Sequence, residues 1–209
     1  MSEKIENEMS TRENHDSYRR SRMSEGGRRQ RQGNRGDEAP LQQQIAWGRQ
    51  ITGRDATHET ILVLFERDGH RFEARNLATA LHRVGKFGGR RLTRDPRLKR
   101  LVDMCARRIG DFKAQEITNS AWGCAKSGFA DQRFFGEIAA EAARQINEFN
   151  PQNLANTVWA FATASVVAER LFKAVAAEVS RRINEFKAQE MANTVWAFCL
   201  CRLGSVSSL

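Results

Sequence analysis

A nine-residue phrase decides the fold of this chain: Asn-Leu-Ala-Asn-Thr-Val-Trp-Ala-Phe at residues 153–161. Most of the phrase returns 37 residues later, as Asn-Thr-Val-Trp-Ala-Phe at 193–198. A repeat of this length is typical of stacked helical hairpins, each of which needs a neighbour to bury its apolar face. The pattern therefore predicts an all-α fold, an α-solenoid with a period of 37 residues. Three residue types keep that step in three copies: Phe112, Phe149 and Phe186; Asn119, Asn156 and Asn193; Trp122, Trp159 and Trp196.

The repeats are predicted to occupy residues 72–209. Their boundaries are 72–111, 112–148, 149–185 and 186–209. The first copy is weaker, because His82 stands where the other copies have tryptophan. The last copy holds only 24 residues, so it is predicted to be truncated and the chain to be a fragment of a longer array. An uncovered apolar face on its helix would be expected to self-associate.

Two segments precede the repeats. Apolar periodicity over 41–71 predicts two short capping helices, the second opening at Thr57 or Thr60. Residues 1–40 are rich in Ser, Arg, Gly, Asn, Gln and Glu, which predicts a disordered polar tail. The arginine-rich part of this segment has the composition of RNA-binding tails, but many inert termini have the same composition. Five acidic residues before position 17 argue against an organelle transit peptide, so a cytoplasmic location also stays open.

The copy at 149–185 predicts a hairpin in detail. Asn150-Pro151 is a strong helix start, since asparagine can cap and proline costs nothing at the first helical position. A turn is expected around Ser165, and a second helix over 169–184. At 100° per residue, Trp159 falls at the edge of the apolar arc of the first helix. Packing between repeats is therefore preferred over base stacking as its role.

An amide is predicted at the middle of the exposed face of each first helix. Asn119, Asn156 and Asn193 occupy this place, and Asn153 is expected on the same face. Amides donate and accept hydrogen bonds, as base edges require. An asparagine ladder between neighbouring helices, or a bond from each amide to the backbone, explains the pattern equally well. Each amide is expected to lie beside a residue with almost no side chain: Gly123, Ala160 and Ala197.

The positive charge is concentrated in one part of the chain. Of the net charge of +9, residues 41–111 contribute +7, from fifteen basic and eight acidic residues. Such an excess is a candidate polyanion patch, since phosphate contacts supply most non-specific nucleic-acid affinity. A well-solvated helical face is the alternative. The basic residues predicted to bind RNA are Arg83, Lys86, Arg90, Arg91, Arg94, Arg97, Lys99 and Arg100.

Other function classes find little support. The sequence contains no run of about 20 apolar residues, so no membrane span is predicted. The sequence holds no glycine-rich phosphate loop, nucleophile motif or metal-spaced cluster, so no enzyme, cofactor, metal or small-molecule substrate is expected. The cysteines lack paired zinc spacing and are expected to be reduced structural thiols: Cys105, Cys124, Cys199 and Cys201.

The phrases at 153–161 and at 76–83 (Asn-Leu-Ala-Thr-Ala-Leu-His-Arg) resemble the degenerate helical repeats of octotricopeptide and FAST-kinase-like (RAP-type) organellar RNA-binding proteins. The resemblance covers about 60–209. It implies an α-solenoid that binds single-stranded RNA in a mitochondrion or chloroplast and acts in RNA processing, stability or translation. The proline-rich signature of the algal repeat and a RAP segment are both missing. A protein–protein scaffold of armadillo or tetratricopeptide type is the alternative, because residues 112–209 carry a net charge of only +1.

Overall fold

The computed structural model describes residues 39–206, with the backbone alone at Arg90 and at 202–206. The predicted tail (1–40) therefore lies outside the described residues except for its last two, of which Ala39 is buried in the core and Pro40 precedes α2. The part of the chain from 39 to 206 is helical and contains no strand, which confirms the predicted all-α class. Its α-helices are α2 (Leu41–Thr52), α3 (His58–Asp68), α4 (Ala74–Gly88), α5 (Pro96–Arg107), α6 (Ala114–Ser127), α7 (Gln132–Arg144), α8 (Pro151–Thr163), α9 (Glu169–Arg181) and α10 (Ala188–Val206). Short 3-10 turns link them: η1 (Gly69–Arg71), η2 (Gly89–Arg94), η3 (Ile109–Asp111), η4 (Ile146–Glu148) and η5 (Ile183–Glu185).

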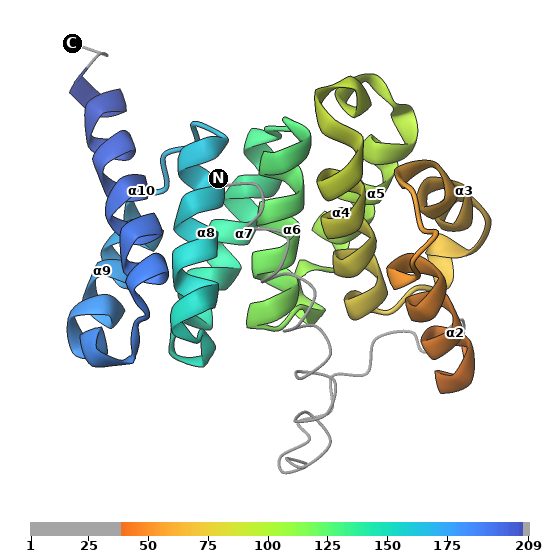
Figure 1. The fold of residues 1–209 in the computed structure, drawn as a ribbon, viewed down its shortest axis with the longest axis horizontal. Helices are drawn as coiled ribbons and strands as arrows, with labels where there is room; N and C mark the ends of the chain where they lie inside the picture. The colour runs from red at the N-terminus through yellow and green to blue at the C-terminus, as the bar shows by residue number, and fades with distance from the viewer. Residues whose placement is uncertain (1–38, 207–209) are drawn as a thin grey trace. The chain divides into compact units, whose positions relative to one another are not determined.

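The repeat helices form two layers (Figure 1). The first helices of the hairpins, α4, α6, α8 and α10, pack side by side and are called the A layer here. The second helices, α5, α7 and α9, also contact one another in order and are called the B layer. The pair α2 and α3 packs against α4 and precedes the repeats. This arrangement agrees with an α-solenoid.

The helix starts follow the sequence signals. Thr57 caps α3 and exchanges hydrogen bonds with Thr60, so both predicted residues take part. Asn150 caps α8, with Pro151 at the first helical position. Asn153 completes this capping box: its backbone N–H donates to Asn150 Oδ1 at 2.8 Å, and its own Oδ1 accepts from Asn150 N. These bonds satisfy donors that the first turn would otherwise leave unpaired.

The repeated phenylalanine anchors each hairpin. Phe72, Phe112 and Phe149 are each 1% exposed. The carbonyl of each phenylalanine accepts a hydrogen bond from a side chain at the end of the second helix in the same repeat, which ties the two ends of the hairpin together. The three bonds run from Arg108 Nη1 to Phe72 O (3.0 Å), from Gln145 Nε2 to Phe112 O (2.8 Å) and from Arg182 Nη1 to Phe149 O (2.7 Å).

The small residues beside the asparagines are buried, so the prediction that they lie on the exposed face was wrong. Gly123, Ala160 and Ala197 lie in the contacts within the A layer. A Cβ built on Gly123 would lie 2.5 Å from the carbonyl oxygen of Leu81 in α4. These positions are small because neighbouring A-layer helices approach closely. Asn153 is buried too, where its capping box holds it.

None of the helices in the described part of the chain is both long enough and apolar enough to cross a bilayer.

Candidate functional site

Each A-layer helix presents a narrow strip on the face away from the B layer. A neighbour covers one or both flanks of the helix, and the B layer lies behind it. Most strip residues are exposed or half-buried, but His82 of α4 is buried, and α10 also exposes Ala192, Val195 and Cys199 outside the strip. The strip consists of residues spaced i, i+4, i+7 and i+11, which share one helix face. Across the four helices it forms four rows: Arg75, Gln115, Gln152 and Gln189; Thr79, Asn119, Asn156 and Asn193; His82, Trp122, Trp159 and Trp196; Lys86, Lys126, Thr163 and Leu200. This set is called the A-layer strip.

The asparagines of the strip are half-buried at its surface. Asn119 Oδ1 accepts from Gln115 Nε2 at 2.9 Å, and Gln115 Oε1 in turn accepts from Asn153 Nδ2 of the next helix at 3.3 Å. The side chains of Asn156 and Asn193 make no hydrogen bond to any described residue. The described residues therefore hold no continuous asparagine ladder, and two of the three amides keep donors and acceptors for a ligand.

The aromatic row is a ladder of nearly parallel rings. The centroids of Trp122 and Trp159 are 6.3 Å apart with 28° between the ring planes, and those of Trp159 and Trp196 are 6.4 Å apart with 24°. His82 continues the row, its ring 4.5 Å from that of Trp122. Trp159 thus bridges the helices before and after it, as its predicted packing role requires. Trp122 and Trp159 are half-buried and Trp196 is 43% exposed, so the row keeps some contact with solvent.

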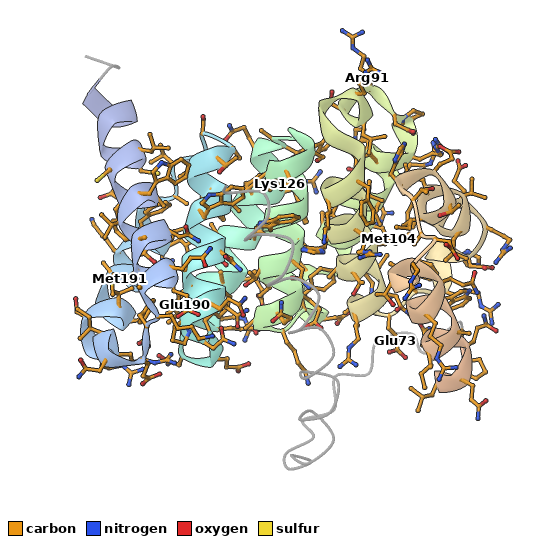
Figure 2. The ribbon with its side chains drawn as sticks, viewed as in Figure 1. Glu73, Arg91, Met104, Lys126, Glu190 and Met191 are labelled. Atoms are coloured by element: carbon orange, nitrogen blue, oxygen red, sulfur yellow. The ribbon has the colours of Figure 1, made fainter. Side chains whose placement is uncertain are left out.

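A lysine lies over this ladder. Lys126 Nζ is 5.5 Å from the ring centroid of Trp122 and 5.3 Å from that of Trp159 (Lys126 is marked in Figure 2). Both distances are within cation–π range. Sequence analysis missed Lys126, although a signal was present. Lysine four residues after a tryptophan lies one turn further along the same helix face.

The basic residues of α4 belong partly to the strip and partly to the fold. Arg83 donates to the carbonyl oxygen of Gly53 at 3.2 Å and so holds the end of α2, and burial lowers its pKa. Burial, followed by the charge of Arg83, lowers the pKa of Lys86. Arg75 is exposed at the first row of the strip. Of the predicted α4 residues, Lys86 is thus better placed than Arg83 to meet a ligand.

The predicted residues on α5 lie in the other layer and in ion pairs. Arg97 bonds Glu59 at 2.7 Å and also Asp95, and these carboxylates raise its pKa. Lys99 pairs with Asp103, and Arg100 pairs with Glu66 of α3. Hydrogen bonding to Arg97 lowers the pKa of both Asp95 and Glu59. The structure therefore separates Arg97, Lys99 and Arg100 from the asparagine row.

The corner after α4 holds the remaining predicted cations. Arg91 and Arg94 are exposed on η2, and Arg91 projects away from the ribbon in Figure 2. η2 contacts α6 as well as α4 and α5. These arginines lie at the end of α4 that carries Lys86. The side chain of Arg90 is outside what the structure describes.

Charge divides the strip into two parts. Its α4 and α6 part carries Arg75, Lys86 and Lys126, and Glu116 near it is taken up in a capping box. The α8 and α10 part has no charged residue at any strip position. Within the described residues, no group of three His, Cys, Asp or Glu side chains could hold a metal ion. The arrangement can offer stacking surfaces, amides and, at one end, cations.

The fold and this strip define an α-helical repeat protein. Three segments of the chain match the model of a family described only as a protein of unknown function (DUF1601): residues 95–120, 130–158 and 168–195. Each matched segment takes in a B-layer helix and the first part of the A-layer helix that follows it. The unit that this family model detects is therefore offset from the hairpin. No curated protein matches the chain.

Proposed function

We propose that the A-layer strip binds single-stranded RNA. The observation that carries the proposal is the periodic pairing of two groups: in three successive helices an asparagine stands one turn before a tryptophan, and the three rings are in register. Helical-repeat proteins that read RNA use two or three side chains per repeat to contact one base. The amides of Asn156 and Asn193, which bond no described residue, have the hydrogen-bonding capacity for base edges, and the indole rings beside them could stack with a base through any exposed part of a ring face.

The basic part of the strip would hold the phosphate backbone. Lys86 and Lys126 lie in one row on neighbouring helices, and the exposed Arg91 and Arg94 lie on η2, at the end of α4 that carries Lys86. A line of cations beside amides and aromatic rings is the combination that single-strand binders use. This assignment moves the RNA contact away from α5, whose predicted cations Arg97, Lys99 and Arg100 are already in ion pairs.

By its resemblance to octotricopeptide and RAP-type proteins, the chain would act without catalysis in the processing, stability or translation of organellar transcripts. Mitochondrial or chloroplast location is part of this proposal. It is tested by imaging the full-length protein with a fluorescent tag at its carboxyl end. A diffuse cytoplasmic signal would count against the organellar part alone.

RNA binding is tested by titrating a labelled single-stranded RNA across a salt series. Lys126→Glu should weaken binding by about tenfold and reduce the salt slope, because a cation near the phosphates is replaced by an anion. The matched control is Arg133→Glu on α7, which makes the same charge change in the B layer at a side chain that is 86% exposed. This control should bind RNA nearly as well as the unmodified chain.

The amides are tested by Asn156→Ala, which should alter the preference among homopolymeric RNAs and leave the salt slope unchanged. Equal losses in Lys126→Glu and Arg133→Glu would mean that only net charge matters. Binding that does not depend on salt would also contradict the proposal.

A protein–protein scaffold is the second candidate, and the uncharged part of the strip favours it. Val195 is 54% exposed, Trp196 43% and Leu200 39%, all on α10. An apolar surface of this kind is suited to a partner polypeptide rather than to phosphates.

A further inference from the structure

The ladder contains two pairs of neighbouring tryptophan rings, each called a step here. The two steps have the same geometry, but the residue one helical turn after the first ring differs. The Trp122–Trp159 and Trp159–Trp196 centroid distances are 6.3 and 6.4 Å, with ring planes 28° and 24° apart. Lys126 places its ammonium over both rings of the first step. The residue at the equivalent position of the second step is Thr163, which is exposed, short and uncharged. Within the described residues, the chain thus contains one pair of rings with a cation over it and an equivalent pair without one.

The surroundings of the second step also favour a cation. Thr163 is the last residue of α8, and the carboxyl end of a helix carries a partial negative charge. No strip position of α8 or α10 carries a positive charge that could take the place of Lys126. Lys187 precedes α10 by one residue and lies nine residues before Trp196, about 13 Å along the axis. The rings there are open to solvent, since Trp196 is 43% exposed.

We propose that the Trp159–Trp196 step binds the side chain of a lysine presented by an extended segment of a partner protein. The ammonium would lie between the two rings as that of Lys126 does in the preceding step. The unpaired amides of Asn156 and Asn193, one turn away, are placed to bond the backbone of the same segment, since a peptide backbone both donates and accepts. This inference goes beyond RNA binding and concerns the uncharged part of the strip.

The experiment titrates the full chain with a blocked pentapeptide that has lysine at its centre and glycine elsewhere. Indole N–H signals are followed by NMR. The signals of Trp159 and Trp196 should shift with millimolar affinity, as expected for one cation–π site at the surface. A peptide with norleucine in place of lysine keeps the four-carbon side chain without the ammonium group, and it should bind about two- to fivefold more weakly.

Two substitutions test which step has a lysine of the chain itself over its rings. Thr163→Lys supplies the missing ammonium from within the chain and should weaken peptide binding at least about tenfold, because an attached side chain competes at a high effective concentration. Lys126→Thr should open the first step, so that the Trp122 signal also responds. The matched control is Gln189→Lys, which adds the same charge at the far end of the strip of α10 and should leave the affinity within about twofold.

The proposal fails if the lysine and norleucine peptides bind equally, or if Thr163→Lys binds the lysine peptide as well as the unmodified chain. It fails in favour of base stacking if uridine monophosphate shifts Trp159 and Trp196 and the lysine peptide does not. Because Thr163→Lys adds positive charge, it should not weaken RNA binding. The failure of this proposal is therefore distinguishable from the failure of RNA binding.

Discussion

Replacing Gly123 by alanine tests the closest contact within the A layer. A Cβ at this position would lie 2.5 Å from Leu81 O, 2.8 Å from Leu81 C and 2.9 Å from His82 Cα, all of them backbone atoms of α4. A flexible side chain cannot relieve these clashes, so α4 and α6 must move apart. Overpacking of this kind costs about 1–3 kcal/mol. Alanine also gains about 1 kcal/mol of helix propensity over glycine.

The two effects are separated by Gly136→Ala on α7. This glycine is exposed within a helix, and a built Cβ meets nothing within 4 Å. Gly136→Ala should therefore stabilise the protein by about 0.5–1 kcal/mol. Gly123→Ala should instead destabilise it, by up to about 2 kcal/mol, since the overpacking offsets the propensity gain. Urea denaturation followed by far-ultraviolet circular dichroism measures both free energies of unfolding.

A second variant checks that the cost arises between the helices. A Cβ on Gly85 of α4 would lie 2.2 Å from Gly123 O, so Gly85→Ala forces the same separation from the other side. The double variant should cost less than the two single changes together, because helices already moved apart accept the second methyl more easily. If Gly123→Ala stabilises the protein as much as Gly136→Ala does, the close approach of α4 and α6 is refuted.

Burial of His82, with the nearby charges of Lys86 and Arg83 adding to it, lowers its pKa to about 3 from 6.5. Below pH 6.5 the unfolded chain therefore takes up a proton that the folded chain refuses, and the free energy of unfolding should fall by up to about 1.4 kcal/mol per pH unit as the pH drops toward 3. His82→Phe should remove this part of the slope in pH-dependent urea denaturation, and equal slopes for the two proteins would contradict it. Thiol labelling of the folded chain should modify Cys199 first, since it is exposed, and spare Cys105 and Cys124, because burial hides these thiols and raises their pKa. Rapid labelling of all four cysteines without denaturant would mean that the A and B layers are not packed as described.

The helical repeat and several of its helix starts could be predicted from sequence because they depend on local signals. The step of 37 residues, the buried phenylalanines and the Asn150-Pro151 cap are all readable from residue type and spacing. The stacking of the tryptophans follows as well, since the same position on adjacent parallel helices brings like side chains together. Which flank of each helix is covered could not be predicted. A helical wheel shows one helix without its neighbours, so it groups Gly123 and Ala160 with the asparagines, although both are buried and Gly123 packs against the preceding helix α4.

The basic patch shows a second limit of the sequence. Arginines and lysines between 83 and 100 are close along the chain, yet α4 and α5 belong to different layers. The acidic partners Glu59 and Glu66 come from α3, more than 30 residues earlier. A running count of charge cannot detect such pairs. A running count of charge also misses Lys126, because residues 112–209 carry little net charge as a whole.

The central claim is that ligands bind along the A-layer strip, and ultraviolet cross-linking to single-stranded RNA tests it most directly. Mass spectrometry of the cross-linked full chain should place the modified peptides on α6, α8 and the corner η2, with Trp122, Trp159 and Lys126 among the modified residues. Cross-links confined to the B-layer helices α5, α7 and α9 would contradict the account.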